Sequence, residues 1–146
     1  MALEKSPSQK PFRVVIVGAG IVGLSLSHAL TLAKIDHVVF EKHSEIVSLH
    51  GAALTIFPSA ARIFDQFGIF EGMKVSTTPV QKEYLRWPDG SVNLETRLMR
   101  DLLAEFDLPT ILFDRQRCVT HLYDGLPDKS VIRTSTCVER IEVREP

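Results

Sequence analysis

The stretch FRVVIVGAGIVGLSLSHALTLAKIDHVVFE, residues 12–41, decides the fold of this chain. It begins with a β-branched run, Phe12–Val17, and continues past a group of glycines into Leu24–Ala33, which favours a helix. A second β-prone run, His37–Phe40, follows that helix. A strand, a glycine turn, a helix and a second strand in this order predict a βαβ unit with two parallel strands.

The three glycines have the spacing G-x-G-x-x-G and lie between the first strand and the helix. Gly18 permits a tight turn out of the strand, and Gly20 lets a pyrophosphate approach the backbone. Gly23 lets the helix pack closely on the sheet. The start of the helix offers N–H groups and a partial positive charge to phosphates. The spacing alone is weak evidence, but in this context it predicts a dinucleotide site.

Glu41 directly follows the second β-prone run. At that position a carboxylate can accept hydrogen bonds from the hydroxyl groups of an adenosine ribose. The same carboxylate would repel a 2′-phosphate, so NADP is disfavoured at this site and FAD or NAD remain.

The composition narrows the class of protein. The chain has 146 residues, of which 45% are hydrophobic, and its 17 Lys and Arg nearly balance its 18 Asp and Glu. This length suits one domain, and the small net charge disfavours a nucleic-acid partner. The five histidines and two cysteines have no metal-ligand spacing, so we expect no metal site.

The N-terminal part of the chain bears on localisation. Residues 1–11 are polar and predict a flexible lead-in rather than a signal peptide. Val14–Ala33 is long and apolar enough to be considered as a transmembrane helix, but its glycines and the apolar run that follows disfavour that alternative. We therefore expect a cytoplasmic chain without a membrane anchor.

Beyond Glu41 the pattern departs from that of a NAD dehydrogenase, which would usually continue with another helix and parallel strand. Pro88-Asp89-Gly90 predicts the turn of a β-hairpin, and Tyr84 and Trp87 lie beside it. The aromatic side chains either wall a substrate pocket or, more often, pack a sheet. The helices expected are Pro58–Phe67, Thr96–Phe106 and Arg115–Tyr123, and the strands are Lys82–Trp87, Ser91–Glu95, Thr110–Phe113, Val131–Thr134 and Val138–Val143.

Five segments follow one another in a distinctive order: GAGIVG, VVFEK, GAALTIFPSAARIFDQFG, a WPDG hairpin and ILFDRQRCVTHLYDGLPD. This order resembles that of the FAD-dependent monooxygenases of the p-hydroxybenzoate hydroxylase type. Within that group the chain is most similar to the fungal enzymes that epoxidise or hydroxylate indole-diterpene and meroterpenoid intermediates. The resemblance implies an α/β fold with a Rossmann-like FAD-binding domain and a β-hairpin insertion. Residues 12–146 would form the N-terminal portion of that domain.

The resemblance also assigns FAD contacts to residues of this chain. The residues assigned to the ADP half are Gly18, Gly20, Gly23 and Glu41. Gly51 and Ala52 would pass close to the flavin, and Arg115 would reach FAD from the side with its guanidinium. Family members often have a second glycine where this chain has Thr55, which places the close backbone approach there in doubt. Without the resemblance, Arg115 is better explained as a surface residue at a helix start, paired with Asp114.

The implied activity is that of an FAD-dependent monooxygenase in fungal secondary metabolism. NAD(P)H would be the reductant, O₂ the co-substrate and a small terpenoid or aromatic molecule the substrate, while no catalytic side chain can be assigned. The family is usually much longer, so we expect this chain alone to be a poor monooxygenase. One alternative is a catalytically inactive nucleotide-binding remnant, or a module that needs a partner chain to supply the missing half. A weaker alternative is a fragment of a NAD-binding dehydrogenase.

Overall fold

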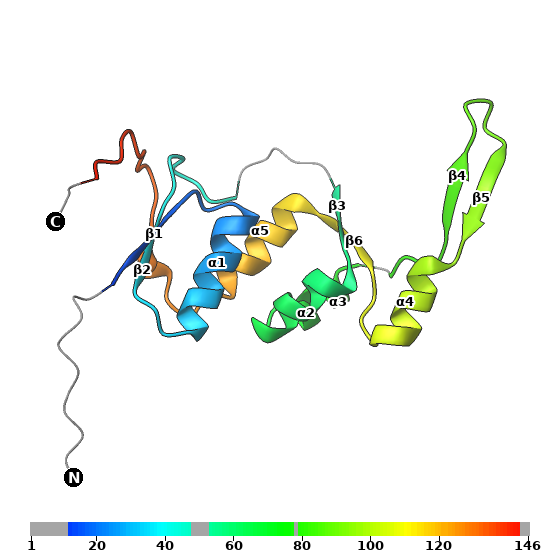
Figure 1. Cartoon of the computed structure of the whole chain (residues 1–146), viewed down its shortest axis with the longest axis horizontal. Coiled ribbons are helices and arrows are strands. Elements are labelled where there is room, and N and C mark those ends of the chain that lie inside the picture. The colour runs from blue at the N-terminus through cyan, green and yellow to red at the C-terminus, as the bar shows by residue number, and fades with distance from the viewer. Residues whose placement is uncertain (1–11, 48–52, 78, 144–146) are drawn as a thin grey trace, which may run out of the picture. The chain divides into compact units, whose positions relative to one another are not determined.

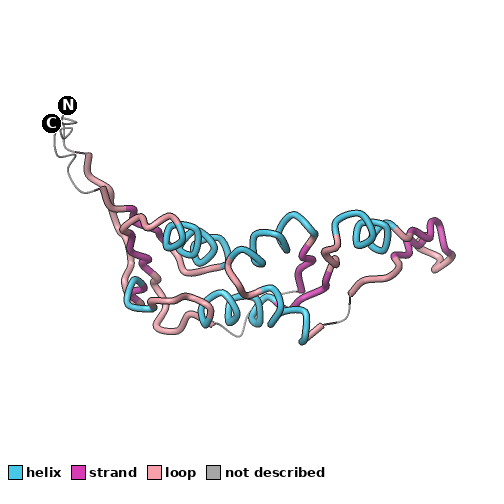
Figure 2. Tube along the Cα trace, turned by 90° about the horizontal axis from the view of Figure 1, so that it is seen from below, coloured by secondary structure: helices cyan, strands magenta, loops and turns pink. Residues whose placement is uncertain are grey.

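The computed structural model describes residues 12–47, 53–77 and 79–143 and has an α/β fold (Figure 1). The chain divides into two compact units, Met1–Ile46 with Asp128–Pro146 (unit 1) and Val47–Pro127 (unit 2). Short strands and helices of moderate length make up both units (Figure 2).

Unit 1 contains a three-stranded parallel sheet with the strand order β1-β2-β7. Its elements are β1 (Val14–Val17), α1 (Ile21–Leu32), β2 (His37–Phe40), the 3₁₀ helix η1 (Lys129–Val131) and β7 (Ile132–Arg133). The helix α1 connects β1 to its parallel neighbour β2, so the predicted βαβ unit is confirmed.

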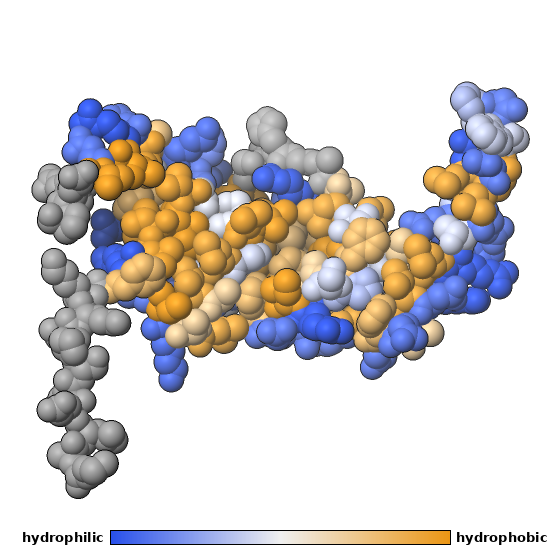
Figure 3. Space-filling view, viewed as in Figure 1, coloured by the Kyte–Doolittle hydropathy of each residue, from blue (hydrophilic) through white to orange (hydrophobic). Residues whose placement is uncertain are grey.

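Among the described residues, strand β1 of the unit 1 sheet has one buried face and one exposed face. Ile16 and Val39 are neighbours in the β1–β2 register and are 5% and 0% exposed, and Leu24 of α1 is also fully buried. Alternate residues of a strand point to opposite faces. Val15 and Val17 accordingly point away from this core and are 53% and 64% exposed. Large apolar side chains at the surface are visible as orange areas in Figure 3.

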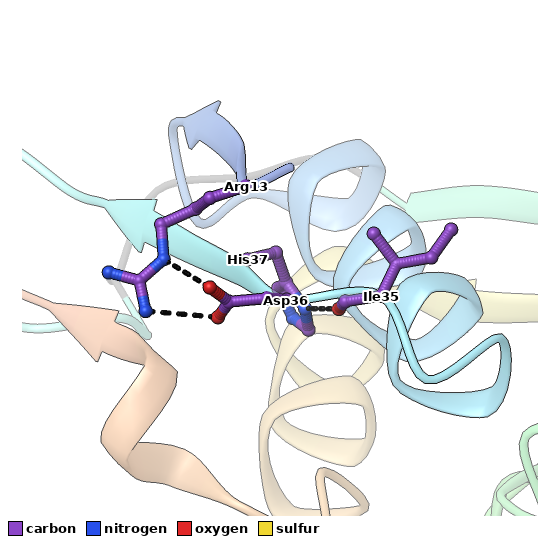
Figure 4. A network of polar contacts seen from close by, with 4 residues as sticks. All are labelled: Arg13, Ile35, Asp36 and His37. Carbon is purple, nitrogen blue, oxygen red and sulfur yellow. Dashed lines mark hydrogen bonds and ion pairs between the residues drawn. The ribbon is translucent and has the colours of Figure 1, made fainter. Parts of the chain in front are cut away.

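A group of polar side chains secures the start of β2 (Figure 4). Arg13 donates to both carboxylate oxygens of Asp36, at 2.6 and 3.0 Å, and thereby lowers the pKa of that carboxyl group. The buried ring of His37 lies 3.0 Å from the carbonyl oxygen of Ile35 and 2.8 Å from the hydroxyl of Ser27. Because a carbonyl can only accept, Nδ1 of His37 donates to Ile35, and a neutral ring then accepts from Ser27 of α1. The contact to Ser27 joins β2 to the helix.

Unit 2 is built from two antiparallel strand pairs, β3–β6 and β4–β5, together with four helices. Its elements are β3 (Ala53–Ile56), α2 (Pro58–Gln66), α3 (Phe70–Val75), β4 (Glu83–Arg86), β5 (Val92–Thr96), α4 (Leu98–Phe106), β6 (Ile111–Asp114) and α5 (Arg115–Asp124). Phe70, Ile111 and Leu122 are completely buried. These side chains come from α3, β6 and α5, so the core of unit 2 joins a strand to helices distant in sequence.

The predicted hairpin with an Asp-Gly turn is confirmed as β4–β5. Gly90 has a φ of +85°, and the Asp89 carboxylate accepts from both the backbone and the hydroxyl of Ser91. Tyr84 and Trp87 are 46% and 57% exposed. The expectation that these two aromatic side chains are packed against a sheet is therefore not met within the described residues.

The helix α3 and two of the predicted strands differ from the prediction. The helix α3 was not predicted, because its six residues FEGMKV include Gly72 and are too few to display a helical period. It is stabilised by burial of Phe70 and Met73. The strand predicted at Val138–Val143 is wrong, since these residues pair with no described strand and a strand requires a hydrogen-bonded neighbour. The strand predicted at Val131–Thr134 is reduced to the two residues of β7.

The apolar run considered as a transmembrane helix, Val14–Ala33, divides into β1, the glycine turn and the 12-residue helix α1. Among the described residues, no helix combines the length and the apolar character that a bilayer span requires.

Candidate functional site

The glycine turn between β1 and α1 has the geometry that its sequence predicts. Gly18 has a φ of +100°, and its N–H donates to the carbonyl of Phe40 at 2.7 Å. A Cβ atom on Gly23 would lie 1.9 Å from the carbonyl oxygen of Gly18, so no side chain fits there without moving the turn. Gly20 differs, because a Cβ on this residue would meet nothing within 4 Å. The backbone at Gly20 is thus open to an approaching group.

The N-terminus of α1 has no side-chain cap. Gly20 is the N-cap residue, its backbone is extended, and the first turn of the helix contains no acidic residue. The N–H of Leu24 bonds to the carbonyl of Gly20 at 2.9 Å, which leaves the N–H groups of the first turn without an intrahelical partner. Such a helix start attracts an anion through its N–H groups and its dipole.

The Glu41 carboxylate lies beside this turn. Its Oε2 accepts a hydrogen bond from the N–H of Ala19 at 2.8 Å, and its Oε1 accepts one from the N–H of His43 at 3.0 Å. Burial alone would raise the pKa of Glu41, but the N–H groups of His43 and Ala19, with a smaller contribution from the charge of Lys42, hold the pKa below its ordinary value. Glu41 is therefore ionised near neutral pH.

A pocket of about 330 Å³ opens next to Glu41 within unit 1. The pocket is lined by residues of three chain segments: Val17, Gly18, Phe40, Glu41, Lys42, Thr136, Cys137 and Val138. This size is at the lower end of the range for small-molecule sites. Two of the predicted site residues, Gly18 and Glu41, are thus brought to the same pocket.

The third of these segments, Thr136–Val138, was not predicted to belong to the site. Backbone hydrogen bonds hold it there, from the N–H of Ser135 to the carbonyl of His43 at 3.0 Å and from the N–H of Thr136 to the carbonyl of Glu41 at 2.9 Å. Ser135 turns the chain with a φ of +51°. Sequence patterns gave no signal for these contacts, because they join backbone groups far apart in the chain.

The two cysteines have different environments. Cys118 of α5 is completely buried, and burial raises the pKa of its thiol to about 11. Cys137 is exposed and lines the pocket beside Glu41. A thiol reagent should therefore modify Cys137 and spare Cys118.

The remaining predicted contacts lie outside unit 1. Arg115 is exposed at the first position of α5 in unit 2, and its assignment to FAD stays a prediction. Asp114 caps α5 with its Oδ1, which accepts from the N–H of Gln116, and the alternative that Arg115 pairs with Asp114 also stays a prediction. Gly51 and Ala52 lie outside the described residues. Within residues 12–47, 53–77 and 79–143, no three His, Cys, Asp or Glu side chains gather in a way that could hold a metal ion.

The chain is similar in sequence to fungal FAD-dependent monooxygenases. It is 40% identical over 144 residues to ausM of Emericella nidulans, a match that covers 98% of this chain and 30% of that protein. It is 42% identical over 135 residues to penE of Penicillium thymicola, which covers 92% of this chain and 28% of that protein. The chain thus spans less than a third of the length of these relatives.

Among solved structures, HpxO of Klebsiella pneumoniae complexed with FAD and uric acid has a similar fold, with a TM-score of 0.74 at 20% identity. That likeness covers 91% of this chain and 33% of HpxO. The sequence profile described as "FAD binding domain" matches residues 12–117. This match spans well over half of the chain, which therefore belongs to the family of FAD binding domains found in FAD-dependent monooxygenases.

Proposed function

We propose that unit 1 binds the adenosine and pyrophosphate parts of FAD. The observation that carries this proposal is the combination of an uncapped helix start with an ionised, oriented carboxylate beside a pocket of about 330 Å³. The backbone at Gly18 and Gly20 and the first turn of α1 would bind the pyrophosphate. Gly23 would allow the close approach of helix and turn that this arrangement requires.

In this proposal Glu41 accepts hydrogen bonds from the ribose hydroxyls, and Val17 and the segment Thr136–Val138 line the space for the adenine. The negative charge of the Glu41 carboxylate disfavours a 2′-phosphate on that ribose. By family resemblance only, Gly51 and Ala52 are assigned to the vicinity of the flavin, and Arg115 is assigned to reach FAD from the side at phosphate or ribityl oxygens.

The activity proposed for the whole protein is that of an FAD-dependent monooxygenase that acts on a small terpenoid or aromatic molecule in fungal secondary metabolism. This proposal is supported by membership of the family and by the fungal relatives named above. FAD, when bound and reduced by NAD(P)H, supplies the redox chemistry that transfers one oxygen atom of O₂. The described residues of this chain contribute binding and orientation, and we assign no catalytic side chain among them.

A second candidate is a nucleotide-binding module that acts together with a partner chain. One observation favours it, since Val15 and Val17 of β1 leave an apolar strand face exposed. Parallel sheets are normally covered on both faces, so a further layer of protein would fit over these valines.

FAD retention tests the binding proposal directly. The purified chain is mixed with FAD, the excess is removed, and the absorbance spectrum is recorded for the wild type and for Glu41→Ala. A retained flavin with a shifted spectrum, lost in Glu41→Ala, is the expected result. A folded wild-type chain that retains no flavin would reject FAD binding by this chain.

Thiol alkylation then tests where the nucleotide binds. Cys137 is the exposed thiol and lines the pocket, while buried Cys118 serves as an internal control. FAD and ADP should both slow the alkylation of Cys137, whereas FMN, which lacks adenosine, should not. Retention of FAD with unchanged alkylation of Cys137 would place the nucleotide elsewhere.

A further inference from the structure

The Glu41 side chain makes contacts that the ribose-binding role does not require. Both of its carboxylate oxygens accept hydrogen bonds from backbone N–H groups, one from Ala19 in the glycine turn and one from His43 in the loop after β2. Both partners of the carboxylate are backbone groups of this chain. Through one side chain, the end of β2 is joined to the turn that leads into α1.

Ala19 depends on this contact. The residue is 2% exposed, so its N–H points into the protein and not into solvent. A buried N–H group without a hydrogen-bond partner destabilises the folded chain. The flanking residues Gly18 and Gly20 have unlike backbone conformations, with φ values of +100° and −77°, so the turn does not continue a regular ladder. The Glu41 carboxylate supplies the acceptor that the turn itself lacks.

Two hydrogen bonds hold the backbone of Glu41 in place. Its N–H donates to the carbonyl of Arg133 and its carbonyl accepts from the N–H of Thr136, both at 2.9 Å. The residue is therefore held at four points, two on its backbone and two on its side chain. Each carboxylate oxygen has a further lone pair beyond the one used by a backbone N–H. A ribose diol could bind these lone pairs without displacing Ala19 or His43.

We propose that Glu41 is a positioning residue as well as a nucleotide ligand: its carboxylate holds the glycine turn at Ala19 in the binding conformation before the nucleotide arrives. The nucleotide part of this statement rests on the proposed function, whereas the positioning part concerns the chain without nucleotide. A test in the absence of FAD therefore separates the two.

The first test is amide hydrogen exchange by NMR on the nucleotide-free chain. In Glu41→Ala, exchange at Ala19 and His43 should become at least about tenfold faster, since a charge-assisted hydrogen bond is lost. In Glu41→Gln, which retains one accepting oxygen, the effect should be smaller. The control is Glu45→Gln, an exposed acid in the same loop, which should leave both amides unchanged.

A ligand role alone predicts unchanged exchange at Ala19 in the nucleotide-free variants, and that result would overturn the proposal. Equal acceleration at core amides such as Leu24 and Val39 would also overturn it, because Glu41 would then stabilise unit 1 as a whole and not the turn.

The second test is read on the wild-type chain, and Glu41→Gln serves only as its control. The amide shifts of Ala19 and His43 should titrate together at acidic pH with one midpoint, and this titration should be absent from Glu41→Gln. An Ala19 shift that does not change with pH would overturn the proposal, whatever the outcome of the FAD experiments.

Discussion

Two strand-to-helix junctions of this protein differ in how they treat the start of the helix. At the junction of β6 and α5, the Asp114 carboxylate accepts from the N–H groups of Gln116 and Arg117 at 2.8 and 3.2 Å. At the junction of β1 and α1, Gly20 occupies the corresponding position and offers no side chain. The start of α5 is completed by its own chain, whereas the start of α1 has no side-chain cap, as the proposed pyrophosphate site requires.

This difference separates a structural helix start from a binding one. A cap such as Asp114 stabilises a helix by about 1 kcal/mol relative to alanine but by only a few tenths of a kcal/mol relative to glycine, and α1 forgoes this smaller amount. In return, α1 keeps N–H donors and a positive dipole end that a carboxylate at the N-cap would neutralise. The acid of the β1–α1 region is Glu41, which binds Ala19 in the turn and leaves the helix start itself open.

The largest loss of stability should follow from adding one methyl group at Gly23, which packs against the glycine turn. Gly23→Ala would place a Cβ atom 1.9 Å from the carbonyl oxygen of Gly18, a backbone atom that cannot move without opening the turn. We expect the free energy of unfolding, measured in urea, to fall by about 3 kcal/mol or more. The matched control is Gly72→Ala in α3, whose Cβ would make an ordinary 3.5 Å contact with the ring of His121. This control should keep or slightly raise the stability, and equal losses in both variants would contradict the packing argument.

Giving the β1–α1 junction an acidic N-cap like that of the β6–α5 junction should weaken FAD binding without preventing folding. In Gly20→Asp the new side chain has room, since a Cβ on Gly20 meets nothing within 4 Å. A carboxylate at this N-cap should raise the stability of the nucleotide-free chain by a few tenths of a kcal/mol. It should also weaken FAD binding by about tenfold or more, because it competes with the pyrophosphate for the same N–H groups.

Fluorescence titration with FAD measures this loss, and Gly20→Ser separates bulk from charge. Serine caps the helix without adding a charge, so its affinity for FAD should lie between those of the wild type and Gly20→Asp. Unchanged affinity in Gly20→Asp would mean that the helix start does not bind the pyrophosphate.

Removing the cap at the junction of β6 and α5 should lower the free energy of unfolding moderately. Asp114→Ala removes the acceptor for Gln116 and Arg117 and should lower the free energy of unfolding by about 1 kcal/mol. Asp114→Asn should restore most of this loss in thermal denaturation, because asparagine caps about as well as aspartate. If alanine and asparagine gave the same stability, the cap would not be the source of the effect.

The two junctions also show what sequence patterns can predict. The β1–α1 region was predicted from local spacing, and β2 begins and ends at His37 and Phe40 as expected. The helix begins at Ile21, three residues before the predicted Leu24, because an N-cap glycine ends the turn earlier than the apolar run suggests. Short-range features such as the glycine spacing and the hairpin turn are encoded in adjacent residues, so their prediction needed no tertiary information.

The parts that were not predicted depend on contacts between distant segments. The pocket wall at Thr136–Val138 is held by backbone bonds from Ser135 and Thr136 to the loop after β2, and backbone groups carry no sequence signature. The contact of Glu41 with Ala19 escaped prediction for a related reason, since the acid was recognised as a ribose ligand from its position after β2. The role of Arg115 remains a prediction, because family resemblance and not local pattern supports it.

The smallest predicted effect is a pH dependence of the stability that Glu41 contributes to the chain. The pKa of Glu41 in the folded chain lies below its ordinary value of 4.5. A carboxyl group with a lowered pKa binds fewer protons in the folded chain than in the unfolded chain, so its stabilising contribution is complete above pH 4.5 and is lost as the pH falls through the folded pKa.

The stability difference between the wild type and Glu41→Gln, measured in urea across this range, should therefore be largest near neutral pH and shrink in acid. The exposed acids with their own partners, such as Asp36 with Arg13, are present in both proteins and cancel in the difference. A difference that stayed constant down to acidic pH would mean that the charge of Glu41 does not stabilise the turn, and the contrast between the two junctions would then rest on the cap of α5 alone.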